Sequence, residues 1–237
     1  MSPPPAPEWL AAVGRELLDL AVPQQCAGCG RPGRPWCGDC AASVRRPSLV
    51  VAGELTCRAA AAHAGPPARA VVAFKDQGLR TLADPLGALL AGTVLDLLDD
   101  APGGCGDPVW LVPVPARRAA RRSRGTDHMV VLAGRAARLL RARGVPAHRC
   151  SALRHVRDSR DQVGLSRDLR RANVEGTLAA GPVPPGLLIL VDDVTTTGAT
   201  LAEAARALRM ATGRTPVAAT LTHAGTTPRL ASRGRRD

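Results

Sequence analysis

Residues 187–200 read LLILVDDVTTTGAT, an apolar run that ends in two adjacent aspartates and continues into a turn rich in threonine and glycine. The apolar run is typical of a buried β-strand, and the residues that follow the turn are typical of a helix. Adjacent carboxylates repel each other and resist burial unless something compensates them. The pair therefore belongs either to a surface turn or to a binding site for a ligand.

The turn itself has the features of an anion-binding site. The N-terminus of a helix offers unpaired backbone N–H groups and a favourable dipole, and Gly198 lets the main chain approach a phosphate closely. A phosphate beside two carboxylates corresponds to a ribose 5-phosphate, whose 2- and 3-hydroxyls donate hydrogen bonds to the carboxylates. The expected ligand contacts are Asp192, Asp193, Thr195, Thr196, Thr197, Gly198 and Thr200.

Other segments alternate between strand and helix patterns, which favours a parallel α/β sheet flanked by helices. Asp84 and Asp127 are expected helix caps, and Gly144 is the expected stop of the second helix. We expect strands at 68–74, 109–114, 187–191 and 216–222, and helices at 8–20, 84–98, 127–143 and 200–210.

Four cysteines form two C-x2-C pairs in CAGCGRPGRPWCGDC, residues 26–40. Two such pairs supply the tetrahedral set of four thiolates that a structural zinc ion prefers, and the glycines allow tight knuckles. A redox role for either pair is the alternative. The expected zinc ligands are Cys26, Cys29, Cys37 and Cys40.

Composition and charge limit the kind of protein further. The chain has 237 residues and 45% hydrophobic content, no apolar run near the ~20 residues of a membrane span, and no secretory signal in MSPPPAPEWL. We therefore expect a cytoplasmic protein without a membrane span, whose cysteines are reduced. Between Pro115 and Arg171 there are sixteen Arg and four Asp, a local balance of +12 that equals the net charge of the chain. This stretch is either a solvated basic face or a surface that attracts phosphates, pyrophosphate or nucleic acid.

The stretch LLILVDDVTTTGA resembles the phosphoribosyl pyrophosphate motif of type I phosphoribosyltransferases, and the chain as a whole resembles the ComF family of competence-type proteins. The further marks of that family are the paired cysteines after an N-terminal segment, AFKDQG near Phe74, LVPVPARRAARRSRG from Leu111 and DQVGLSRDLRRANVEG from Asp161. Many relatives have Phe-Asn-Gln where this chain has Thr126-Asp127-His128. The carboxylate and the imidazole could cap the following helix or contact a ligand, and we favour the cap.

The resemblance implies a domain plan and a set of roles. Residues 1–58 would form a helix and a zinc module, 59–225 a phosphoribosyltransferase-like domain, and 226–237 a basic disordered tail. It implies Mg²⁺ bound together with phosphoribosyl pyrophosphate, and a flexible lid at 158–173. The implied pyrophosphate or DNA-backbone contacts are Lys75, Arg117, Arg118, Arg121, Arg122, Arg124, Arg160, Gln162 and Arg171.

Three functions remain compatible with these features. ComF proteins are linked to uptake of single-stranded DNA, so a DNA-handling protein that works with DNA-uptake partners is one. A phosphoribosyltransferase with an unknown acceptor is the second, and a regulator that senses phosphoribosyl pyrophosphate is the third. Aromatic residues make up only 2% of the chain, so base-stacking surfaces are scarce and any DNA binding would depend on the phosphate backbone.

Overall fold

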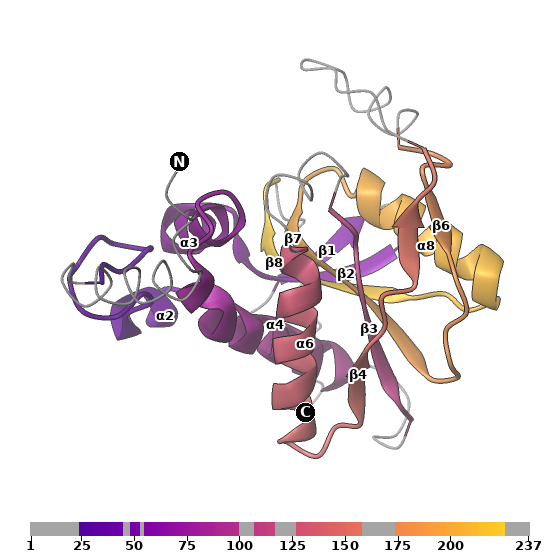
Figure 1. Cartoon of the computed structure of the whole chain (residues 1–237), viewed down its shortest axis with the longest axis horizontal. Helices are drawn as coiled ribbons and strands as arrows, with labels where there is room; N and C mark the ends of the chain where they lie inside the picture. The colour runs from indigo at the N-terminus through magenta and orange to yellow at the C-terminus, as the bar shows by residue number, and fades with distance from the viewer. Residues whose placement is uncertain are drawn as a thin grey trace, which may run out of the picture.

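The computed structural model describes residues 24–44, 48–52, 55–99, 107–116, 127–157 and 174–225. The main sheet has the strand order β1-β2-β8-β7-β3-β4, and its last five strands are parallel, while β1 is antiparallel at the edge. The expected α/β architecture is therefore confirmed (Figure 1). The strands are β1 (Ser48–Ala52), β2 (Leu55–Ala62), β3 (Val109–Pro113), β4 (Ala147–Arg149), β7 (Leu187–Thr195) and β8 (Val217–His223).

Helices cover both faces of this sheet. On one face α4 (Ala83–Asp99) and α6 (His128–Arg141) bury a row of leucines against Ile189 and Val191 of β7, with α3 (Gly65–Lys75) at their side. On the other face α8 (Ala199–Thr212) packs against Leu190 of β7. Each fully buried leucine contributes about 1.5–3 kcal/mol to folding, so these two cores fix the helices to the sheet.

The order of the strands reverses between β3 and β7. The chain leaves β3 through α6 to reach β4 on one side, and it leaves β7 through α8 to reach β8 on the other side. Because α6 and α8 lie on opposite faces, the carboxyl ends of β3 and β7 form a topological switch point. In parallel α/β sheets ligands bind in the crevice that is expected at such a point.

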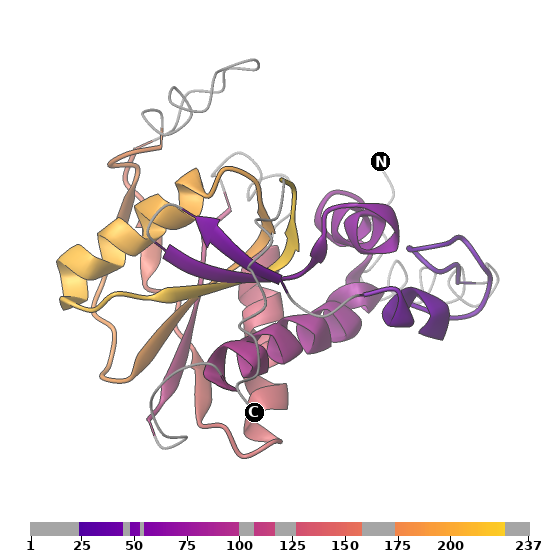
Figure 2. The same cartoon turned by 180° about the vertical axis from the view of Figure 1, so that it is seen from behind.

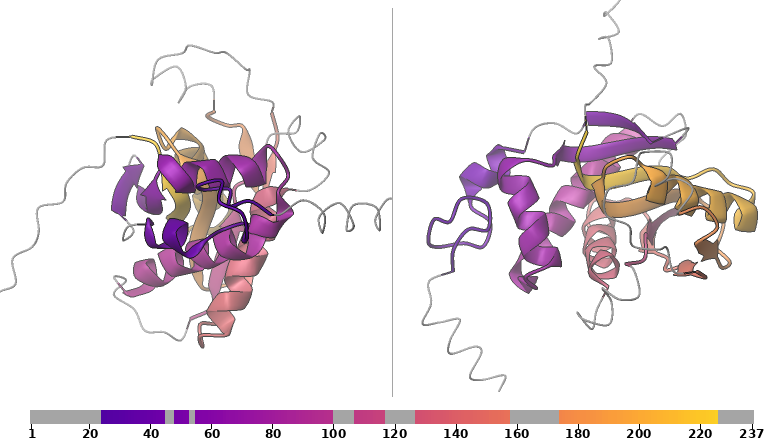
Figure 3. Two further views of the ribbon diagram at one scale, coloured as in Figure 1. Left: turned by 90° about the vertical axis from the view of Figure 1, so that its left-hand side faces the viewer. Right: turned by 90° about the horizontal axis from the view of Figure 1, so that it is seen from above.

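Two smaller elements complete the described part of the chain. A two-stranded sheet, β5 (Leu153–His155) with β6 (Leu178–Ala180), packs beside α8, where the Leu178 N–H donates to the buried Glu203 carboxylate at 3.0 Å. The module that contains α2 (Gly38–Ala42) lies at one end of the molecule, next to α3 and far from α8 (Figures 2 and 3). Gly28 is needed there, because a Cβ would come within 2.6 Å of the Cys40 Sγ.

Most expected elements are present, but one is wrong. Residues 68–74 belong to α3 and not to a strand, because two prolines start the helix and Ala70, Val71 and Phe74 face the core at helical spacing. The sheet also begins at Ser48, so the expected domain boundary at 58/59 falls inside β2, which pairs with β8. The segments 8–20 and 226–237 lie outside the described residues.

One stretch within the described residues, Arg80–Asp99, is long and apolar enough to cross a membrane, with a mean hydropathy of 1.4. It comprises η1 (Arg80–Leu82) and α4, and half of it is buried. Its apolar side is accounted for by contacts with β8 and α6, as expected for the core helix of a soluble protein.

Candidate functional site

The turn between β7 and α8 has the form of a phosphate-binding turn. Gly198 has φ 75° and stands immediately before the first residue of α8, a conformation that favours glycine over other residues. The Ala199 N–H donates to the Thr197 hydroxyl at 3.4 Å, while Thr196 and Thr200 are exposed. The hydroxyl of Thr195 is buried and has no hydrogen-bond partner among the described residues. The turn therefore exposes Thr196 and Thr200 beside Gly198, whereas Thr195 is the buried last residue of β7 and Thr197 accepts a hydrogen bond from the turn itself.

The two aspartates at the end of β7 have different surroundings. Successive side chains of a strand alternate between the faces of the sheet, and Val191 belongs to the core beside α4 and α6, whereas Leu190 belongs to the core beside α8. Asp193 accordingly faces Lys75 of α3 and His128 of α6. The alternation directs Asp192 toward the α8 side, but its carboxyl stays close enough to Asp193 for the two groups to interact.

Asp193 is held by two donors from distant parts of the chain. The Lys75 ammonium lies 2.7 Å from its Oδ2, and the His128 Nε2 donates to the same oxygen at 2.8 Å. Asp193 is only 5% exposed. Burial alone would raise its pKa, but the hydrogen bond from His128 and the charge of Lys75 hold the pKa of Asp193 below its ordinary range. This carboxylate is therefore ionised and already paired.

Asp192 is in a different state. It forms no ion pair within the described ranges, and one of its oxygens accepts the N–H of Asp193 at 2.9 Å. Burial first, and then the charge of Asp193, raise the pKa of Asp192 well above its ordinary value. The charge of Lys75 opposes this rise only in part, so the Asp192 carboxyl gains from a ligand that donates hydrogen bonds or brings a cation.

Lys75 and His128 thus belong to the site in different ways. Lys75 was expected to contact a phosphate, and in the structure its partner is Asp193. For Asp127 and His128 the sequence left a helix cap and a ligand contact open, and the cap was favoured; the contact of His128 with Asp193 was not predicted. Asp127 caps α6, accepting the Met129 N–H at 3.1 Å, and this cap turns the next side chain toward β7.

The other expected anion contacts lie outside the described residues. These are Arg117, Arg118, Arg121, Arg122, Arg124, Arg160, Gln162 and Arg171. The two ends of the first arginine-rich stretch are described and meet at the switch point, since the Ala116 N–H donates to the Asp127 Oδ2 at 3.0 Å. This stretch is therefore anchored at both ends beside β3.

The four expected zinc ligands converge. Their Sγ atoms all lie within 4.8 Å of one another, with Cys26 and Cys40 3.6 Å apart and Cys29 and Cys37 3.7 Å apart. Four sulfurs at about 2.3 Å from one ion are about 3.8 Å from each other, so the cluster fits a structural metal and is compatible with zinc.

The two buried thiols of this cluster differ in acidity. Burial first, and then hydrogen bonds with the neighbouring thiols, raise the pKa of Cys40 far above its ordinary value. Burial opposes ionisation of Cys26, but backbone N–H groups of Cys37, Cys29 and Gly28 lower the pKa of Cys26 to about 6. Cys26 is therefore thiolate at neutral pH, which is the form that binds a metal.

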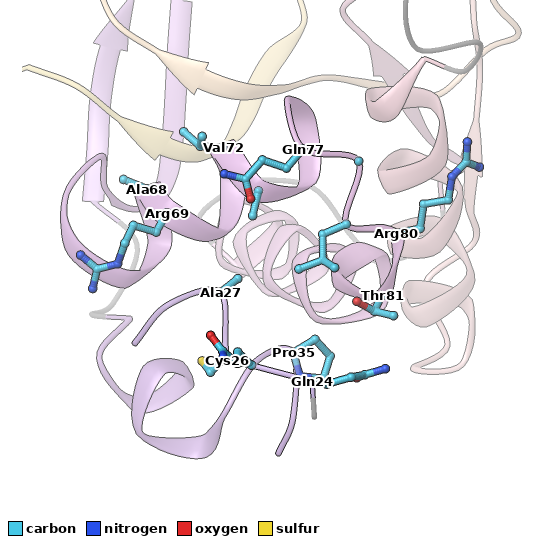
Figure 4. A pocket seen from close by; sticks show the side chains of 14 residues that line it. Gln24, Cys26, Ala27, Pro35, Ala68, Arg69, Val72, Gln77, Arg80 and Thr81 are labelled. Atoms are coloured by element: carbon cyan, nitrogen blue, oxygen red, sulfur yellow. The ribbon is translucent and has the colours of Figure 1, made fainter. Parts of the chain in front are cut away.

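Two hollows lie beside the turn that follows α3. The larger, a groove of about 1020 Å³, separates the cysteine module from α3, and in Figure 4 Cys26 and Pro35 face Ala68 and Val72 across it. The smaller, about 400 Å³, lies between that turn and α6, and it is lined by Lys75 and His128. Only the smaller one includes residues that contact Asp193.

No family model matches the chain, and no curated protein matches it.

Proposed function

We propose that this chain is a cytoplasmic, ComF-like protein that binds phosphoribosyl pyrophosphate at the carboxyl edge of β7. The ribose hydroxyls would donate to Asp192, and the 5-phosphate would accept from the Thr195–Thr200 turn. Asp193 would also accept a hydrogen bond from the ribose when a ribose hydroxyl displaces Lys75 or His128. A structural zinc ion in the four-cysteine module completes the proposal.

The observation that carries this proposal is the position of the turn. An unpaired, half-buried carboxylate and a threonine-rich turn with a glycine before the helix occur together at the switch point between β3 and β7. If the stretch were an ordinary surface turn, neither the unpaired carboxylate nor the threonine-rich turn would be expected beside a topological switch point. The structure of the described residues supports this ligand over a sulfate-like anion alone, since Asp192 requires a donor group on the ligand.

The arginine-rich stretch anchored at Ala116 and Asp127 supports the pyrophosphate part of the ligand. Guanidinium groups bind phosphate oxygens in a bidentate manner, and the stretch begins where β3 ends. Mg²⁺ carried by the pyrophosphate would neutralise further charge, and a carboxylate such as Asp192 is a ligand type that it accepts. Transfer to an acceptor would then depend mainly on positioning and charge neutralisation.

Calorimetric titration with phosphoribosyl pyrophosphate, with and without Mg²⁺, tests the proposal. We expect saturable binding that Mg²⁺ strengthens, and no comparable binding of ribose, which lacks both phosphate groups. A pyrophosphate-release assay over candidate acceptors then separates a transferase from a sensor. Absence of binding under both conditions would remove the proposal.

A second function is supported by the charge between Pro115 and Arg171, where the whole net charge of the chain is concentrated. We propose that this stretch also allows binding to the backbone of single-stranded DNA, as in a DNA-uptake role. Affinity should fall steeply with salt and depend little on sequence. Binding that is independent of salt, or selective for one sequence, would contradict it.

A further inference from the structure

The 400 Å³ pocket beside the Asp193 cluster has the size of a small-molecule site. It lies where the C-terminal end of α3, the following turn and η1 face the first turns of α6 (Figure 1). Lys75 and His128 line it on one side and contact Asp193 on the other. A molecule in this pocket would therefore be separated from Asp193 by a single layer of side chains.

The charges of this pocket are mostly positive. Lys75, Arg80 and Arg135 line it, and Asp76 is the one acidic residue among its described lining. Arg135 is 3.3 Å from Asp84, but that carboxylate is 70% exposed, so the pair leaves Arg135 only weakly neutralised. Arg80 is exposed and has no ion pair within the described ranges, and in Figure 4 its side chain points away from the cysteine module. The pocket thus has a positive excess that a ligand can satisfy.

The wall of the pocket is apolar and contains a ring. Phe74 packs edge-on against the His128 ring, with centroids 6.4 Å apart, and Val131 and Ala83 lie beside them. Phe74 is the only phenylalanine of the chain and Lys75 the only lysine, and the chain has no tyrosine. The pocket therefore combines the only phenylalanine ring of the chain with three cationic side chains.

We propose that this pocket binds a small organic anion, in which a carboxylate or phosphate is attached to a flat apolar group. The flat group lies against Phe74 and Val131, and the anion lies between Arg80, Arg135 and Lys75. Its position next to Asp193 makes this anion the second substrate or co-ligand of the phosphoribosyl site. That assignment rests on the proposed function, whereas anion binding in the pocket does not.

The single phenylalanine provides a local test. Protein labelled only at phenylalanine gives one ring signal, from Phe74, and its NMR shift reports ligands in this pocket. Benzoate and phenyl phosphate serve as probes, and benzamide is the uncharged match of benzoate. We expect saturable shifts with at least one of the two anions and at least tenfold weaker binding of benzamide. The tighter anion identifies the preferred acidic group. Unmoved signals with both anions, or equal binding of benzoate and benzamide, overturn the proposal.

A pair of variants separates the pocket from general surface charge. Arg80→Gln with Arg135→Gln should weaken anion binding about tenfold or more. Arg138→Gln is the matched control, because Arg138 lies one turn further along α6, contacts the same Asp84 at 3.4 Å and does not line the pocket. Equal loss in both variants overturns the proposal. If the double variant does not fold, the contrast between benzoate and benzamide in the native protein still decides.

Titration with phosphoribosyl pyrophosphate on the same samples keeps the two proposals apart. If an anion shifts the Phe74 signal but phosphoribosyl pyrophosphate does not bind, the pocket proposal stands and the proposed function is rejected. If phosphoribosyl pyrophosphate binds but neither anion shifts the signal, the proposed function stands and the pocket proposal is rejected. When both ligands bind, the native protein should take up benzoate or phenyl phosphate with a changed affinity once phosphoribosyl pyrophosphate is present, because Lys75 is shared.

Discussion

Two groups of ionisable side chains in this molecule are compensated in different ways. In the cysteine module four thiols converge, with all sulfurs within 4.8 Å of one another. At the end of β7 two adjacent carboxyls differ, since Asp193 is paired with Lys75 and His128, whereas Asp192 has no ion pair within the described residues. The thiols are spaced three apart on tight knuckles, whereas the aspartates are neighbours in a strand with a period of two.

The difference shows that neighbours in the sequence need not share a ligand. Four converging thiols need one cation, and a metal ion meets that need for all of them. The two adjacent carboxyls are compensated unequally, because Lys75 and His128 both contact Asp193. Asp192 remains without such a partner in the described part of the chain, so it is the carboxyl with room for a ligand.

The largest effect is expected when one thiol of the four-cysteine cluster is removed. Purified protein should carry about one zinc per chain, and Cys40→Ser should release it and unfold the module, since zinc supplies on the order of 10 kcal/mol to small modules of this kind. Metal analysis and thermal melting measure both effects. Cys150→Ser, outside the module, is the control. Protein prepared under reducing conditions without chelator that contains no metal would show that the thiols converge for another reason.

Removing the charge of Asp193 should have the next largest effect on stability. Asp193→Asn leaves Lys75 and His128 without their shared anion. A fully buried pair costs roughly 3–5 kcal/mol when one partner is removed, and the Lys75 side chain is 34% exposed, so we expect a loss of about 2–3 kcal/mol. Denaturant unfolding measures it. A variant as stable as the native protein would mean that the cluster adds nothing to folding.

The acid dependence of stability should have opposite signs at the two aspartates. The folded pKa of Asp193 is lowered, so its contribution is complete above pH ~4 and is lost as the pH falls through the folded pKa. The folded pKa of Asp192 is raised, so stability falls as the pH rises from ~4 to that folded pKa. Asp192→Asn should remove this fall, so the variant should be the more stable protein at neutral pH.

Urea unfolding of the native protein and of Asp192→Asn between pH 4 and 7.5 measures that dependence. The two curves should separate as the pH rises, with the variant the more stable. Parallel curves would contradict the raised pKa, and a less stable variant would mean that Asp192 has a favourable partner.

Much of the fold follows from sequence pattern, and the reasons for the failures are physical. The helices after Asp127 and Gly198 were predicted correctly, and the strand predicted at 187–191 is present but continues to Thr195, through both aspartates. The strand β2 has the sequence LTCRAAAA, whose alanines favour no strand, and pairing with β1 and β8 makes it one. The prediction of a strand at 68–74 was wrong, because contiguous apolar residues fit a buried strand and a buried helix equally well.

The candidate site divides in the same way. The cysteine cluster depends on local spacing, and its convergence was predicted from that spacing alone. The contacts of Lys75 and His128 with Asp193 could not be predicted from local spacing, because they depend on α3 and α6 approaching β7 from distant parts of the chain. The signal that was available for His128 was its place directly after a helix cap, which turns a side chain toward the sheet.

The most direct test of the central claim is a titration of Asp192→Asn with phosphoribosyl pyrophosphate, paired with its melting temperature. The account predicts affinity lower by ten- to a hundredfold, the loss of one charge-assisted hydrogen bond worth about 1.5–3 kcal/mol, in a protein that melts at the native temperature or above. Lower affinity together with unchanged or higher stability is the expected signature of a ligand contact. Native affinity in a folded Asp192→Asn variant would contradict the claim and leave the aspartate pair as part of an ordinary turn.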